Sequence, residues 1–178
     1  THTQNFSEQF FRRVLYALEK EQVFVPIGAG MYKFKEQESD RTGKYSYSPS
    51  NKLFSTHQVL QKVFPYLDYL CWETSFLHEF MTNQPGQNLI VIETEKDACE
   101  SVFNELKKKY NGRVFLDPDR SVMENYVLPQ VDPIIVTPLI SQSPRTIDSG
   151  IPFPKLEKIL VDIFVNRDIF FMFQGREL

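Results

Sequence analysis

Apolar residues near the start of the chain recur at helical spacing and then give way to an alternating pattern. Ser7 can cap a helix that has one apolar face. Residues 22–34 alternate around Gly28 and Gly30, which predicts a tight reversal between two short strands. A helix followed by such a hairpin is typical of the second half of a winged helix-turn-helix. The apolar helix face is formed by Phe10, Phe11, Val14, Leu15 and Leu18.

A polar segment at residues 35–51, poor in aliphatic residues and rich in turn formers, predicts a boundary between two modules. We assign residues 1–44 to a partial winged helix-turn-helix, with its recognition helix and wing, and residues 45–178 to an α/β domain. The chain begins at Thr1 and not at Met, and it lacks the helices that precede a recognition helix in a complete winged module. We therefore expect that the start has been removed.

The second domain alternates between strand-like and helical patterns, which predicts an α/β fold (α+β overall) with a partly parallel, mixed sheet. Ser55 or Thr56 caps its first helix. Two prolines in 132–140 place that strand at an edge or limit its length, and residues 141–154 are expected to form a long loop. The predicted strands are 66–72, 88–93, 113–116 and 132–140, and the predicted helices are 55–64, 74–81, 96–110, 120–128, 155–164 and 168–173.

Charge limits the kinds of partner. The 178-residue chain has 20 basic and 23 acidic residues. Residues 1–44 hold 7 of the basic and 6 of the acidic ones, so the remaining 13 and 17 leave the second domain acidic. This balance disfavours broad, nonspecific nucleic-acid binding by the second domain, and any DNA contact by the first module is modest or shared by a dimer.

Composition indicates a globular protein of the cytoplasm. Sixteen Phe and eight Tyr can supply a core. Cys71 and Cys99 have no His or Cys at ligand spacing, so neither a zinc site nor a disulfide framework is predicted. No run approaches the roughly 18 apolar residues of a membrane span, and the start lacks the pattern of a signal peptide.

Two groups of carboxylates follow predicted strands. Asp117 and Asp119 are placed like a Mg²⁺-binding pair of a nucleotidyltransferase, but the Gly-Ser turn and helix that hold the nucleotide phosphates are missing, so a turn that caps the next helix is favoured. Glu93, Glu95 and Lys96 resemble the acid-x-Lys element of restriction-type nucleases, with the spacing off by one residue. We expect Glu95 to cap a helix and Lys96 to be exposed.

The histidines and the lone tryptophan favour packing over chemistry. His57 and His78 lie far apart in the sequence without a nucleophile motif, so a hydrolytic triad lacks its parts. Trp72 follows a strand, and we expect it in the core, with Thr74 capping the next helix.

The order of motifs resembles the AbiEi antitoxin family. A Gly-x-Gly-x-Tyr motif closes the wing in that family and occurs here in Ile27-Gly-Ala-Gly-Met-Tyr32. A Pro-x-Leu-Glu-Lys-x-Leu-Val-Asp segment marks the late helix of the family's C-terminal domain and occurs here in Pro154-Lys-Leu-Glu-Lys-Ile-Leu-Val-Asp-Ile-Phe164. The stretches Trp72-Glu-Thr-Ser-Phe-Leu77 and Phe173-Gln-Gly-Arg-Glu-Leu178 resemble a divergent branch described only as a domain of unknown function.

The resemblance implies a bacterial, noncatalytic protein of an abortive-infection toxin-antitoxin pair that works without a cofactor or metal. Its winged module binds operator DNA and represses its own operon, with a homodimer on DNA as one option. Its C-terminal domain opposes a nucleotidyltransferase-like toxin encoded alongside. The implied DNA-contacting residues are Asn5, Ser7, Gln9, Arg12 and Arg13 on the recognition helix, and Lys33 and Lys35 flank the wing for phosphate contacts.

Two alternatives stay open at this point. One is a metal-dependent nuclease or nucleotidyltransferase-like enzyme that uses Glu93, Asp117 and Asp119. The other is a noncatalytic protein-interaction domain in which the wing is only structural.

Overall fold

The chain divides into two compact units, one of residues 1–46 with Leu178 and one of residues 47–177. The computed structural model describes residues 24–28, 31–34, 48–81, 86–140 and 143–173. The helix predicted from Ser7 and the predicted boundary after residue 44 lie outside these residues. No helix within the described ranges is long and apolar enough to cross a membrane.

The first unit contains the predicted hairpin. Strand β1 (Phe24–Gly28) pairs antiparallel with β2 (Met31–Phe34). Phe24 lies opposite Phe34, and Gly28 lies opposite Met31, so only residues 29 and 30 connect the strands. The prediction of two short strands with a reversal near Gly28 is therefore confirmed.

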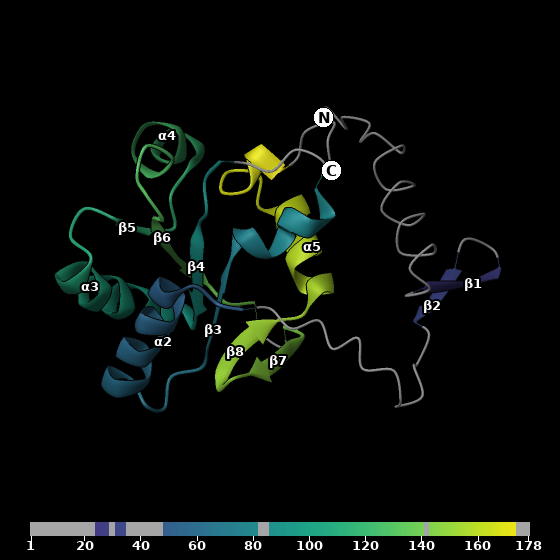
Figure 1. Cartoon of the computed structure of the whole chain (residues 1–178), viewed down its shortest axis with the longest axis horizontal. Coiled ribbons are helices and arrows are strands. Elements are labelled where there is room, and N and C mark those ends of the chain that lie inside the picture. Colours follow the sequence, from purple (N-terminus) through teal and green to yellow (C-terminus); the bar gives the residue numbers. More distant parts are fainter. Residues whose placement is uncertain (1–23, 29–30, 35–47, 82–85, 141–142, 174–178) are drawn as a thin grey trace. The chain divides into compact units, whose positions relative to one another are not determined.

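The second unit is built around a four-stranded mixed sheet in the order β3-β4-β6-β5 (Figure 1). Strand β3 (Tyr69–Glu73) runs antiparallel to β4 (Ile90–Thr94), whereas β6 (Ile134–Pro138) runs parallel to both β4 and β5 (Val114–Leu116). Every residue of β3 and β4 is buried. The predicted fold class, an α/β domain with a mixed sheet, is confirmed.

Strand β6 lies in the centre of the sheet and not at an edge, because it pairs with β4 on one side and β5 on the other. Proline cannot donate a ladder hydrogen bond, yet both prolines are tolerated here. Pro133 precedes the strand and Pro138 is its last residue. The prolines were expected either to place this strand at a sheet edge or to limit its length. The structure shows that they limit its length.

Helices cover both faces of the sheet (Figure 1). The helices α2 (Asn51–Val63) and α3 (Cys99–Lys109), the latter preceded by the 3₁₀ turn η2 (Lys96–Ala98), lie on one face. The other face carries α5 (Leu156–Val165) with the 3₁₀ helices η1 (Thr74–Phe80) and η4 (Phe171–Phe173). Between β5 and β6 the chain forms α4 (Arg120–Val122), which continues as a π-helical turn, η3 (Met123–Val127).

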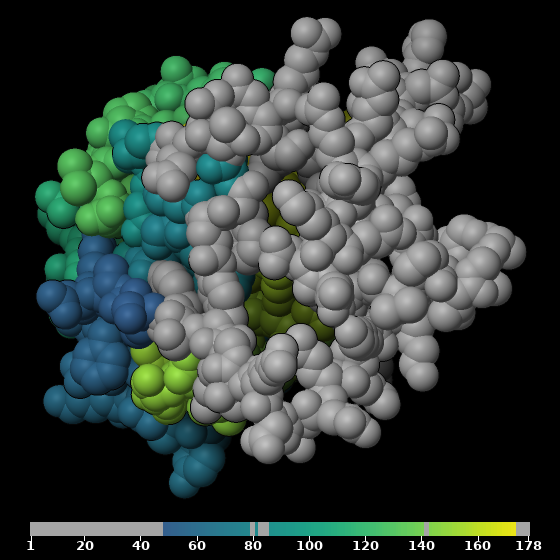
Figure 2. Space-filling model, turned by 45° about the vertical axis from the view of Figure 1, so that its right-hand side comes forward, coloured from purple at the N-terminus to yellow at the C-terminus, as the bar shows by residue number. Residues whose placement is uncertain are grey.

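Residues 141–154 do not form the long loop that their Ser, Pro and Gly content predicts. They contain the antiparallel hairpin of β7 (Arg145–Asp148) and β8 (Ile151–Pro154). Ser149 and Gly150 connect the strands, and both have positive φ, at 51° and 80°. This is the backbone of a two-residue hairpin turn that suits the twist of the strands. Figure 2 shows this hairpin, in yellow-green, on the same face of the unit as the blue α2.

Helix capping differs from the sequence prediction at three places and agrees at one. Ser50, and not Ser55 or Thr56, caps α2, since its hydroxyl oxygen accepts a hydrogen bond from the Leu53 backbone N–H at 3.1 Å. The Thr74 hydroxyl accepts from the Leu89 backbone N–H, and the Glu95 side chain makes no capping bond. The prediction that agrees is at Asp119, whose carboxylate caps α4 by accepting a hydrogen bond from the Val122 backbone N–H at 2.8 Å.

We expect Ser50→Ala to lower the free energy of unfolding by about 1 kcal/mol, because the replacement leaves a helix N–H without its acceptor. Ser55→Ala is the matched control, since Ser55 lies inside the helix, where alanine is at least as favourable. Urea denaturation of both variants measures the difference. Equal losses in the two variants would contradict the assignment of the cap.

Candidate functional site

Polar side chains meet at the carboxyl edge of the three parallel strands. Glu93 on β4 lies opposite Thr137 on β6 in the parallel register. The Thr137 hydroxyl donates to Asp117 Oδ1 at 3.2 Å, and Asp117 directly follows β5. Sheets of this kind hold ligands beyond the carboxyl ends of their strands. The edge beside β4 and β6 is therefore the first place to look for a site.

Glu93 is part of a buried ion-pair cluster. The Lys158 ammonium on α5 donates to Glu93 Oε2 and to Asp162 Oδ2. The side chains of Lys158, Glu93 and Asp162 are only 5%, 4% and 14% exposed. Trp72 Nε1 on β3 donates to the other Glu93 oxygen at 2.8 Å. One lysine thus joins the last long helix to the middle of the sheet.

Sequence reasoning did not identify Lys158 because it belongs to a lysine- and glutamate-containing segment that looks solvent-facing. Ile159 and Ile163 form a buried apolar stripe on α5. Lys158 lies next to this stripe on the helix surface and is buried with it. The available signal was the spacing of Lys158 and Asp162, which at four residues apart face each other on one side of a helix.

Burial dominates the acid-base properties of the cluster. It raises the pKa of Glu93 above its ordinary value of 4.5, against the opposing effects of the Lys158 charge and of the hydrogen bonds from Lys158 and Trp72. Burial likewise raises the pKa of Asp162 above 3.8, opposed by Lys158. The two carboxyl groups share the single Lys158 charge, so this charge offsets only part of the free-energy cost of removing each carboxylate from water.

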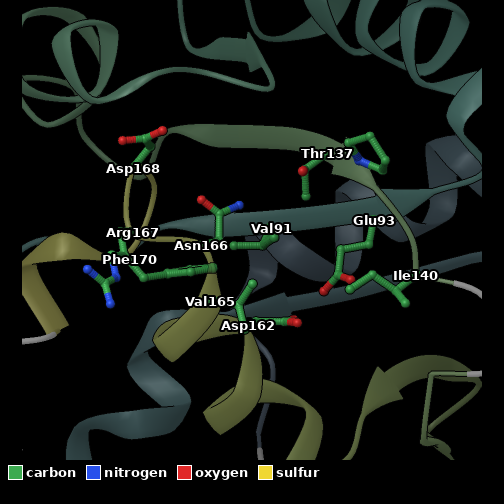
Figure 3. A pocket seen from close by; sticks show the side chains of 11 residues that line it. Val91, Glu93, Thr137, Ile140, Asp162, Val165, Asn166, Arg167, Asp168 and Phe170 are labelled. Atoms are coloured by element: carbon green, nitrogen blue, oxygen red, sulfur yellow. The ribbon is translucent and has the colours of Figure 1, made fainter. Parts of the chain in front are cut away.

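The cluster borders a cavity of about 370 Å³ between the end of α5 and the sheet (Figure 3). We call it the α5 pocket. Figure 3 shows Glu93, Thr137 and Ile140 toward one end, Arg167 and Asp168 toward the other, and Val91 between them. The polar side chains that line the pocket are Glu93, Thr137, Asp162, Asn166, Arg167 and Asp168.

Aromatic packing closes the apolar side of this site. The Trp72 and Phe170 rings stack with their centroids 5.6 Å apart. Trp72 is 1% exposed, which confirms its predicted place in the core. Because Trp72 also donates to Glu93, it both fills the core and orients a pocket carboxylate. His57 is a packing residue on the opposite face, where the Tyr69 hydroxyl and His57 Nδ1 are 2.9 Å apart.

The structure describes one of the residues implied in DNA binding. Lys33 lies on β2, opposite Val25. The others lie outside the described residues, namely Asn5, Ser7, Gln9, Arg12, Arg13 and Lys35. Their roles remain predictions.

The carboxylates of the alternative enzyme hypothesis have separate bonding partners. Glu93 binds Lys158, Asp117 accepts from Thr137, and Asp119 caps α4. Within the described part of the chain, no three His, Cys, Asp or Glu side chains come together as a metal site requires. The predicted exposure of Lys96 is confirmed.

Removal of the Lys158 charge should be strongly destabilising. We expect Lys158→Met to lower the free energy of unfolding by about 3–5 kcal/mol, because the buried Glu93 and the half-buried Asp162 carboxylates lose the cation that pairs with both. Lys155→Met is the matched control, since Lys155 is exposed at the start of the same helix. Adding Glu93→Gln to Lys158→Met should restore part of the loss. Urea denaturation measures all three variants, and a small loss in Lys158→Met would contradict a buried charge cluster.

Stability should also depend on pH through Glu93. A carboxyl group whose pKa is raised on folding binds its proton more tightly in the folded state, so its contribution is complete below pH 4.5 and is lost as the pH rises through the raised pKa. We therefore expect the free energy of unfolding of the wild-type protein, relative to Glu93→Gln, to fall with rising pH above 4.5. Denaturation at a series of pH values tests this, and a difference that increases with pH would contradict it.

Comparison with known proteins identifies the family but no characterised relative. Neither a curated protein nor a solved structure matched the chain significantly. A family model matched residues 10–178, which is nearly the whole sequence. The chain belongs to the family of unknown function DUF6577.

Proposed function

We propose that this chain is a noncatalytic, DNA-binding transcriptional regulator of the cytoplasm and the antitoxin of an abortive-infection toxin-antitoxin pair. Its first unit contacts operator DNA. Its second unit opposes a nucleotidyltransferase-like toxin encoded alongside. Two observations support the proposal, namely the order of the motifs in the sequence and the division of the chain into two compact units.

The β1–β2 hairpin is the observation that carries the proposal. It is antiparallel, only two residues separate its strands, and it follows directly on the segment predicted as a recognition helix. This is the position of the wing in a winged helix-turn-helix. In such a module the helix reads base edges in the major groove while flanking basic residues contact phosphates.

The bonding of the second unit supports a noncatalytic role. Glu93 and Asp119, two of the three carboxylates of the enzyme hypothesis, hold structural positions in an ion pair and a helix cap. A Mg²⁺-dependent nuclease or nucleotidyltransferase needs these oxygens free to bind metal.

The number of basic side chains sets the expected strength of DNA binding. If Arg12, Arg13, Lys33 and Lys35 each neutralise one phosphate, the logarithm of the binding constant falls with a slope of about −3.6 against the logarithm of salt concentration. The affinity per chain then falls about 150-fold between 50 and 200 mM salt. This is modest electrostatic binding, so base contacts from the helix must supply the specificity.

We expect the full-length protein to bind DNA from upstream of its own gene, and Arg12→Ala/Arg13→Ala to abolish specific binding and reduce the salt slope by about 2. Lys107→Ala/Lys108→Ala is the matched control, because it removes the same charge from exposed positions on α3 in the second unit. Fluorescence anisotropy across a salt series measures both variants. Absence of binding at every salt concentration, or equal loss in the control, would contradict DNA recognition by the first unit.

A further inference from the structure

A surface groove lies between the C-terminal halves of α2 and α3, which pack beside each other on the sheet face opposite to α5 (Figure 1). Its volume is about 320 Å³. We call it the α2–α3 groove. It is lined from α2 by Val59, Lys62 and Val63, and from α3 by Glu105, Lys108 and Lys109.

The lining carries positive charge, although the second domain is acidic overall. Three lysines and one glutamate line the groove. The Lys108 ammonium pairs with Glu105, so the glutamate offsets one of the three positive charges. Lys62 forms no ion pair within the described ranges, and Lys109 donates to a backbone carbonyl at 3.4 Å. Two ammonium groups, one on each helix, therefore have no carboxylate partner among the described residues.

The remaining part of the lining is apolar. Val59 and Val63 are four residues apart on α2, so they lie on the same side of the helix. Val63 is 42% exposed, and Val59 is half-buried. Protein interfaces combine an apolar centre with a polar rim. The α2–α3 groove offers both, since its valines can cover an apolar side chain and its lysines can pair with carboxylates.

The residue types in the groove favour a peptide over a nucleic acid. Single-stranded nucleic acids are held by stacking of their bases on aromatic side chains, and arginine is the residue that best matches phosphate geometry. The six described lining residues include neither an aromatic residue nor an arginine. A lysine ammonium is a point charge that pairs with a carboxylate, and an apolar side chain gains free energy when it is buried against valines.

We propose that the α2–α3 groove binds an acidic peptide segment of a partner protein, with an apolar side chain between its carboxylates. The apolar side chain packs on Val59 and Val63, and the carboxylates pair with Lys62 on α2 and Lys109 on α3. Opposite charge on the two surfaces selects this partner against basic segments. The groove goes beyond the proposed regulatory function, which assigns no role to this face of the second unit.

Nuclear magnetic resonance titration of the isotope-labelled, full-length chain with the peptide acetyl-Glu-Glu-Leu-Leu-Glu-Glu-amide tests the proposal. The control peptide has glutamine in place of every glutamate. We expect saturable shifts of the amide signals of α2 and α3 with the acidic peptide, and about tenfold weaker binding of the control peptide. Binding of both peptides alike, or of neither, would overturn the proposal. The titration contains no DNA, so its outcome is independent of the regulator proposal.

A nucleic acid is the competing occupant of a basic groove. Titration of the same chain with an oligothymidylate measures it, and the α2 and α3 signals separate this groove from any DNA contact of the first unit. We expect these signals to stay unshifted. Shifts as large as those caused by the acidic peptide would overturn the assignment to a peptide.

Charge-neutralising variants locate the binding site. Lys62→Gln/Lys109→Gln should weaken binding of the acidic peptide about tenfold, because it removes both ammonium groups that lack a carboxylate partner. Lys96→Gln/Lys155→Gln is the matched control, since it removes the same charge from exposed positions outside the groove. Lys62→Gln alone, at an exposed position, keeps the test valid should the double variant fail to fold. Unchanged affinity in the groove variants, or an equal loss in the control, would overturn the proposal.

Discussion

The buried ion pair between Lys158 and Glu93 is the constraint on which the second unit depends. Moving an ammonium group from water into the protein interior costs several kcal/mol, on the order of the values for buried ions, unless a carboxylate partner lies close by. The two residues are 65 positions apart in the sequence and lie on α5 and β4. Through Trp72, the same carboxylate is bonded to β3. The position of α5 over the sheet, and with it the shape of the α5 pocket, follows from this three-element connection.

The sequence predicts those parts of the fold in which local pattern and tertiary environment agree. The strand predicted at 88–93 is observed as β4, and the helix predicted at 96–110 is observed as the turn η2 followed by α3. The β7–β8 hairpin was missed because the turn at Ser149 and Gly150 lies in a segment whose composition resembles a loop. The central place of β6 depends on which strands pair, and proline content alone does not specify pairing.

The candidate site was harder to predict than the fold. Glu93 was identified by its place at the end of a strand, but its partner Lys158 comes from a distant helix. Only the four-residue spacing to Asp162 separates Lys158 from the neighbouring exposed lysine. Burial of a charged residue follows from three-dimensional packing, which the sequence does not show. The spacing along the chain indicates only that Lys158 and Asp162 can form an ion pair. The cap at Asp119 was predicted correctly, since this carboxylate follows a strand and directly precedes the next helix.

The proposed division of labour assigns operator DNA to the first unit and opposition of the toxin to the second unit. Hydrogen exchange of the full-length chain, measured by mass spectrometry with and without DNA from upstream of its own gene, tests this division most directly. We expect DNA to slow exchange in peptides from residues 1–46 and to leave peptides from residues 47–177 unchanged. Slowed exchange confined to residues 47–177, or no change in either unit under conditions where DNA is bound, would contradict it.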